Sequence, residues 1–181
     1  WYRLMQKGQQ PLNFIREGTG SAADQPTLHA WLRTPARCKS FAAIVGSPVA
    51  HSHTPIEQYD FFINRDMPVF AIEVGRETFQ RDMEILKRLG GRAFAVTSPL
   101  KHEAYDLADQ LTATARQFRS VNTLVWSQES WCADNTDFLG LKELLHPHMS
   151  EKIAVWGGGG TLSLLQHLVP HAQFYSASTG S

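Results

Sequence analysis

Short apolar runs that alternate with helical patterns constrain the fold of this chain more than any other feature. The apolar runs cover 41–45, 69–74 and 93–96, and each has the length of a buried strand. Between them, apolar residues recur at helical spacing over 54–63 and 76–89. Strands that alternate with amphipathic helices form parallel sheets with right-handed crossovers. The sequence therefore predicts an α/β sandwich.

Turn and capping residues set the expected ends of these elements. Thr54 and Pro55 predict a helix that begins with threonine as N-cap and proline in its first turn. The pair Gly90 and Gly91 predicts the end of the second helix. Thr27 to Arg33 is a short helix candidate near the N-terminus.

The middle of the chain continues the alternation. We expect a helix over about 105–118, a strand over 120–126, and a turn at 127–130 that returns the chain antiparallel to itself. A polar cluster, Asp134 to Asp137, then precedes an expected helix over 138–145. Helix capping is the usual explanation of such a cluster, and this alternative stays open here.

A run of glycines follows the next expected strand, at 152–156, and precedes an expected helix over 161–168. Strand, glycine turn and helix are the context of a dinucleotide site, because glycine lets the backbone approach a pyrophosphate. A further strand at 173–177 would complete a βαβ unit, although Leu162 stands where a third fingerprint glycine is usual. The alternative is a flexible turn. The cofactor-binding candidates are Gly157, Gly158, Gly159, Gly160 and Thr161.

Composition narrows the class of function. The chain has 181 residues, 43% of them apolar, which suits one domain or one and a fraction. Its 17 basic and 17 acidic residues balance, so we expect a small-molecule site and neither a nucleic-acid nor a membrane partner. Cys38 and Cys132 are too few for a disulfide framework, which favours a reducing cytoplasm. No apolar run reaches the length of a membrane span, and no signal peptide is recognised.

Lys101 is the strongest catalytic candidate. It follows the apolar run at 93–96 and the sequence Thr97-Ser-Pro99, so it stands at the carboxyl end of an expected strand. Open α/β sheets bind their ligands at that edge. Pro99 stops the strand and suits the first turn of a following helix. A solvated surface lysine is the alternative interpretation.

Histidines give no metal site. His51 and His53, and the pair His167 and His171, have metal-like spacing, but no carboxylate or cysteine completes either set.

Several motifs together resemble the shikimate dehydrogenase family, over about 44–160. The segment 46–55 (GSPVAHSHTP) is similar to that family's substrate-carboxylate loop, and 95–101 (AVTSPLK) to the motif with the catalytic lysine. The segment 121–124 (VNTL) resembles its ring-hydroxyl strand, and 135–140 (NTDFLG) the motif with the aspartate. The glycines after Trp156 resemble its NADP loop.

The resemblance implies a three-layer open-sheet substrate domain followed by the start of a Rossmann-like dinucleotide-binding domain. It implies NADP-dependent, reversible reduction of 3-dehydroshikimate to shikimate in aromatic amino acid biosynthesis. Lys101 and Asp137 would be catalytic, and the substrate-binding residues would be Ser52, Thr54, Thr97, Lys101, Asn122 and Asp137. A quinate/shikimate dehydrogenase that uses NAD, and a non-catalytic module that binds a cyclic hydroxy acid, stay open as alternatives.

Departures from the family are also visible. Ala95 stands where the family often has Asn or Ser, Tyr59 where Asn is common, and Arg119-Ser120 where Gly-Ala is usual. The resemblance also leads us to expect that the last part of a family member, with most of its nucleotide domain, is not represented. Oligomeric state is not indicated by the sequence.

The expected domains are an N-terminal extension at 1–39, a substrate-binding domain at 40–134 and a partial NADP-binding domain at 135–181. Within the extension, 20–27 (GSAADQPT) is similar to the end of type I dehydroquinate dehydratase. That similarity would make the chain the junction of a two-enzyme fusion. An extension without a site of its own is the alternative.

Overall fold

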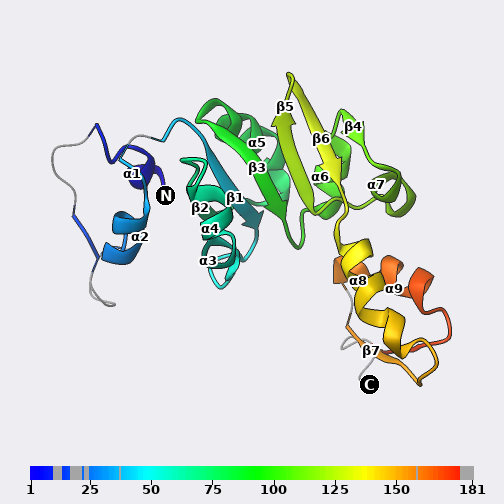
Figure 1. Ribbon diagram of the computed structural model, residues 1–181. Coiled ribbons are helices and arrows are strands. Elements are labelled where there is room, and N and C mark those ends of the chain that lie inside the picture. The colour runs from blue at the N-terminus through cyan, green and yellow to red at the C-terminus, as the bar shows by residue number, and fades with distance from the viewer. Residues whose placement is uncertain (10–13, 17–21, 23–24, 37, 158, 176–181) are drawn as a thin grey trace. The chain divides into compact units, whose positions relative to one another are not determined.

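The computed structural model describes residues 1–9, 14–16, 22, 25–36, 38–157 and 159–175 (Figure 1). The chain forms two compact units, Trp1–Ala95 and Val96–Ser181. These units do not follow the expected domain ends at 39 and 134, and the domain assignment stays a prediction. Each unit is described by itself below.

The first unit is built on parallel strands. Strand β1 (Phe41–Gly46) is buried along its whole length and lies between β2 (Val69–Glu73) and β3 (Gly91–Val96). It pairs in parallel with β2, with Ala42 opposite Val69. A strand buried on both faces reads as a continuous apolar run, which is why the sequence predicts it well.

Strand β2 is connected to β3 by the 3₁₀ turn η1 (Arg76–Thr78) and helix α5 (Phe79–Arg88). Its buried residues Phe79, Met83 and Leu86 recur at helical spacing, as predicted. Gly90 ends the helix with φ of 100°, and a Cβ there would lie 2.5 Å from the Lys39 carbonyl oxygen. The sharp return into β3 therefore requires glycine.

The expected helix over 54–63 is wrong in detail. It forms two short helices, α3 (Thr54–Glu57) and α4 (Tyr59–Ile63), interrupted at Gln58. His53 is the N-cap and Thr54 the first helical residue, because the Ser52 hydroxyl accepts the Thr54 backbone N–H. Beside the interruption, the Tyr59 hydroxyl donates to the Arg33 carbonyl oxygen at 3.3 Å, a tertiary contact that helical propensity does not include.

The N-terminal segment packs within the first unit. It contains α1 (Tyr2–Met5) and the expected short helix α2 (Leu28–Arg33). Thr27 is the N-cap of α2, and its side chain accepts the Ala30 N–H. Lys7 Nζ donates to the carbonyl oxygens of Trp31 and Thr34, at 2.6 and 2.8 Å. Half of the dehydratase-like segment at 20–27, namely 20, 21, 23 and 24, lies outside the described residues.

The expected helix over 105–118 is also wrong. The chain forms α6 (Lys101–Leu107), the two-residue strand β4 (Gln110–Leu111) and α7 (Ala113–Phe118). Strand β4 pairs in parallel with β6 (Ser130–Asp134). The Asp109 carboxylate accepts the Trp131 N–H at 2.8 Å, so a partner distant in sequence breaks the helix.

The hairpin is confirmed. Strand β5 (Thr123–Ser127) pairs antiparallel with β6, and Gln128 and Glu129 turn the chain with φ of 49° and 58°. The sheet of the second unit is therefore mixed.

The end of the second unit forms the expected βαβ unit. This part of the chain contains α8 (Asp137–Leu145), η2 (His146–His148), β7 (Ala154–Trp156), η3 (Gly159–Thr161), α9 (Leu162–Leu168) and β8 (Gln173–Tyr175). The βαβ unit itself consists of β7, α9 and β8. Strands β7 and β8 pair in parallel, and α9 contacts α8 (Figure 1). Among the described residues, no helix has the length and apolarity needed to cross a membrane.

Candidate functional site

Lys101 and Asp137 form an ion pair within the second unit. Each is the first residue of its helix, α6 and α8 respectively, and 36 positions of sequence separate them. Lys101 Nζ lies 2.5 Å from Asp137 Oδ2, and the two side chains are 14% and 28% exposed. The pair is thus partly screened from water but open enough to meet a ligand.

Asn122 fixes the orientation of the carboxylate. Its side-chain nitrogen donates to Asp137 Oδ1 at 2.7 Å and to the Thr136 hydroxyl at 3.0 Å. Its side-chain oxygen accepts the Thr136 backbone N–H at 2.9 Å. An amide has two donors and one acceptor oxygen, so this asparagine is fully engaged and cannot flip without loss.

Main-chain hydrogen bonds place these residues side by side. The Lys101 carbonyl oxygen accepts the Val121 N–H at 3.0 Å, which ties the start of α6 to the approach of β5. The Asn122 carbonyl oxygen accepts the Val96 N–H at 2.7 Å, and the Asn122 N–H donates to Asp134 at 3.1 Å. These bonds hold Lys101 and Asn122 close together in the second unit.

Helix capping does not explain the polar cluster before α8. The N-cap, Thr136, makes no side-chain capping hydrogen bond. Asn135 is 1% exposed and donates to the Ser120 carbonyl oxygen at 2.9 Å, while Asp137 faces Lys101 and Asn122. The capping interpretation is therefore wrong, and the cluster supports the site.

Thr97 directly follows β3, and its half-buried hydroxyl makes no hydrogen bond to the part of the chain that the structure describes. It thereby keeps both donor and acceptor capacity. Its binding role stays a prediction.

Gly160 lies beside the lysine side chain. A Cβ built on it would stand 3.2 Å from Lys101 Cδ and 3.8 Å from Cε. The aliphatic part of Lys101 therefore runs along the glycine turn while its amine meets Asp137. The sequence did not predict this contact or the hydrogen bonds between Thr136 and Asn122, because neither leaves a signal in the local sequence.

The glycine turn suits a phosphate-bearing cofactor in one respect. Gly157 and Gly159 have φ of 83° and 39°, and a Cβ on either would meet no atom within 4 Å. Open backbone of this kind is what close approach of a pyrophosphate requires. Gly158 lies outside the described residues.

Ser52 and Thr54 form a hydroxyl pair in the first unit. Ser52 Oγ donates to Thr54 Oγ1 at 3.1 Å and accepts the Thr54 N–H at 3.2 Å. Both residues are half-buried. The pair is preorganised, but it belongs to a different unit from Lys101, and its role stays a prediction.

The histidine pairs gather no metal ligands. Among the described residues, no three His, Cys, Asp or Glu side chains lie close enough to hold an ion. His167 instead packs against the rings of Phe118 and Phe138, with centroids 5.4 and 6.1 Å away.

The cluster in the second unit can bind and protonate an oxygen. An ammonium group donates hydrogen bonds, and its carboxylate partner accepts them, so together they can hold one hydroxyl and exchange its proton. This chemistry belongs to acid–base catalysis at a carbonyl or an alcohol.

Comparison with known proteins identifies a family. Residues 44–124 match the family described as the shikimate dehydrogenase substrate binding domain. The shikimate dehydrogenase (NADP(+)) of Syntrophobacter fumaroxidans is 37% identical over 103 residues, which cover 57% of this chain and 36% of that protein. The shikimate dehydrogenase (NADP(+)) of Prochlorococcus marinus strain MIT 9301 is 32% identical over 136 residues, 72% of this chain and 48% of that protein.

A solved structure agrees with the fold. The crystal structure of shikimate dehydrogenase from Aquifex aeolicus superimposes with a TM-score of 0.65 at 26% identity, covering 76% of this chain and 54% of that one. The α/β fold expected from the sequence is confirmed. The chain spans about half the length, or less, of the curated relatives it matches.

Proposed function

We propose that this chain serves the reversible, NADP-dependent reduction of 3-dehydroshikimate to shikimate. The match of residues 44–124 to the shikimate dehydrogenase substrate binding domain supports the proposal. The observation that carries the proposal is the contact of Lys101 with Asp137, held in place by Asn122. The relatives themselves are enzymes named for NADP(+), which is the basis for choosing this nucleotide.

Lys101 acts as the general acid in the direction of reduction. The nicotinamide cofactor, when bound, supplies hydride to the ketone carbon. The Lys101 ammonium group gives a proton to the ketone oxygen, which becomes the new hydroxyl, and in the reverse direction the amine takes that proton back. Asp137 holds the ammonium group in position and accepts a hydrogen bond from a substrate hydroxyl.

Hydroxyl, amide and carboxylate side chains select the substrate. Thr97 and Asp137 bind ring hydroxyls, and Asn122 joins them by exchanging one of its present hydrogen bonds for one to the substrate. Ser52 and Thr54 donate hydrogen bonds to the substrate carboxylate. A site built to hydrogen-bond hydroxyls rejects analogues that lack them, because its polar groups are then left unpaired. The glycine turn at 157–160 and Thr161 hold the cofactor phosphates by their backbone, which the open space around Gly157 and Gly159 supports.

Replacing Lys101 by alanine in the full-length protein tests the proposal. We expect kcat for shikimate oxidation to fall at least about 100-fold, since general acid–base catalysis contributes that much or more. The dissociation constant for shikimate, measured by calorimetry, should change far less. Lys142→Ala is the matched control, because Lys142 is an exposed lysine on α8.

Near-normal turnover in Lys101→Ala would refute the assignment. The nucleotide and the substrate are tested in the same assay, by comparing kcat/KM for shikimate and quinate with NADP and with NAD. Higher kcat/KM for quinate with NAD would replace the proposed substrate and cofactor.

A further inference from the structure

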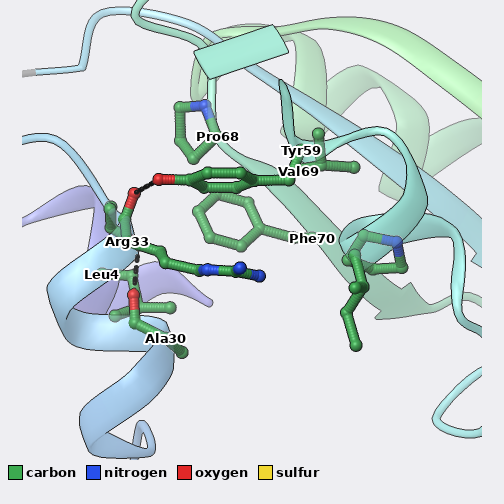
Figure 2. A pocket seen from close by; sticks show the side chains of 10 residues that line it. Leu4, Ala30, Arg33, Tyr59, Pro68, Val69 and Phe70 are labelled. Atoms are coloured by element: carbon green, nitrogen blue, oxygen red, sulfur yellow. Dashed lines mark hydrogen bonds between the residues drawn. The ribbon is translucent and has the colours of Figure 1, made fainter. Parts of the chain in front are cut away.

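A cavity of about 140 Å³ lies within the first unit, between the N-terminal segment and the elements around β2 (Figure 2). Leu4, Ala30, Pro55, Val69 and Phe70 supply most of its apolar lining. An apolar cavity of roughly this size, about 150 Å³, accepts a single benzene ring. Its dimensions therefore suit a molecule with one ring.

The aromatic wall of the cavity carries a cation. The guanidinium carbon of Arg33 lies 4.5 Å from the centre of the Tyr59 ring, and Figure 2 shows the group stretched below that ring beside Phe70. A guanidinium stacked on a ring keeps its N–H bonds in its own plane, so its edge remains available to an anion.

Other polar groups at the cavity already have partners. The Tyr59 hydroxyl donates to the Arg33 carbonyl oxygen, and the Thr34 hydroxyl donates to the Ala30 carbonyl oxygen. Within the described part of the chain, the Arg33 guanidinium has neither a carboxylate partner nor a hydrogen bond. The Arg33 guanidinium can therefore pair with an anion of a ligand whose apolar part fills the cavity.

We propose that the cavity binds a small carboxylic acid with one apolar ring, aromatic or saturated. The ring lies in the apolar space against Tyr59 and Phe70, and the carboxylate pairs with the edge of Arg33. A polyhydroxylated ring is disfavoured here, because its hydroxyls would be buried against carbon without partners. The site is therefore different in chemistry from the polar cluster around Lys101.

Calorimetric titration with sodium benzoate tests the proposal, with benzamide as the uncharged probe of the same shape. We expect saturable binding of benzoate, and binding of benzamide at least fivefold weaker. Arg33→Met should weaken benzoate at least fivefold by removing the charge. Ala30→Leu should weaken it as much by filling the space, and circular dichroism confirms that each variant is folded.

Arg65→Met is the matched control. Arg65 also stacks on an aromatic ring of the first unit, 4.1 Å from the centre of Phe61, but it does not line the cavity. Its loss should change the dissociation constant of benzoate by less than twofold.

Two results would overturn the proposal. One is an unchanged affinity for benzoate in Arg33→Met, and the other is the absence of saturable binding. If benzoate instead occupied the Ser52 and Thr54 hydroxyl pair, Ser52→Ala would lose it while Arg33→Met retained it, and the cavity would be excluded as its site.

Discussion

The substitution Asp137→Asn tests whether the negative charge of this side chain, and not only its size, is needed for activity. Asp137→Asn keeps the size of the side chain but leaves Lys101 Nζ facing a neutral amide. Under the proposed mechanism, we expect kcat to fall about 100-fold in the full-length protein, a typical contribution of a positioned acid–base group. Steady-state kinetics measure this. Asp106→Asn, at an exposed position of α6, is the control and should retain activity.

Gly160 sets the path of the lysine chain. In Gly160→Ala the new methyl group would stand 3.2 Å from Lys101 Cδ, so the lysine must shift by a few tenths of an ångström. We expect a lower kcat with a smaller change in KM for shikimate.

Gly140→Ala is the control for this substitution. Gly140 lies within α8, and a Cβ there meets no atom within 4 Å. That variant should keep its activity and gain up to about 1 kcal/mol of stability, since alanine favours helices over glycine. Equal kinetics for the two variants would show that the contact with Lys101 does not matter.

Cys38 should react with thiol reagents only at high pH. Burial raises the pKa of its thiol above the ordinary value of 9.0, although a backbone hydrogen bond opposes the effect. A raised pKa lowers the thiolate fraction at any given pH, and the thiolate is the reactive form. Alkylation by iodoacetamide, followed by mass spectrometry of the Cys38 peptide, should therefore still accelerate above pH 9. A rate that levels off below pH 9 would contradict this.

At the scale of single elements, α7 depends on its N-cap. The Thr112 hydroxyl accepts the Ala115 N–H at 3.3 Å and donates to Asp134 Oδ1 at 2.6 Å. We expect Thr112→Ala to lower the free energy of unfolding by about 1 kcal/mol, the usual cost of losing an N-cap. Urea denaturation measures it. Thr112→Ser retains the oxygen and should lose less than half as much, and equal losses would exclude the cap as the cause.

Elements with a local signal could be predicted from the sequence. Strand β1 is a continuous buried apolar run, β2 and β3 contain shorter apolar runs at 69–72 and 93–96, and α5 has a clear helical period. Strand β4 has no such signal. It consists of two residues and forms by pairing with β6, whose position the local sequence does not encode. The same holds for the break at Gln58.

The sequence predicted some residues of the candidate site and missed others. Lys101, Asn122 and Asp137 lie together, because Lys101 and Asp137 each begin a helix and Asn122 directly precedes β5. Gly160 and Thr136 were missed, since their contacts depend on segments that only the tertiary fold brings together. Ser52 and Thr54 meet each other, and their part in substrate binding stays a prediction.

For the whole molecule, charge balance governs solubility. With 17 basic and 17 acidic residues, the net charge is zero at pH 7 when the eight histidines are neutral. Lowering the pH adds protons to the chain and makes its net charge positive. Proteins near zero charge associate most readily. We expect the least polyethylene glycol to be needed for precipitation near pH 7, and clearly more near pH 5. A minimum near pH 5 would contradict this expectation.

The short distance between the Asn122 amide and the Asp137 carboxylate has a chemical consequence. Spontaneous deamidation would convert its amide into a second carboxylate, 2.7 Å from an oxygen of Asp137. Two carboxylates that close cannot both stay ionised, so one would hold a proton and the pairing with Lys101 would change. Under the proposed mechanism, proton transfer by Lys101 would then decline as preparations of this protein age.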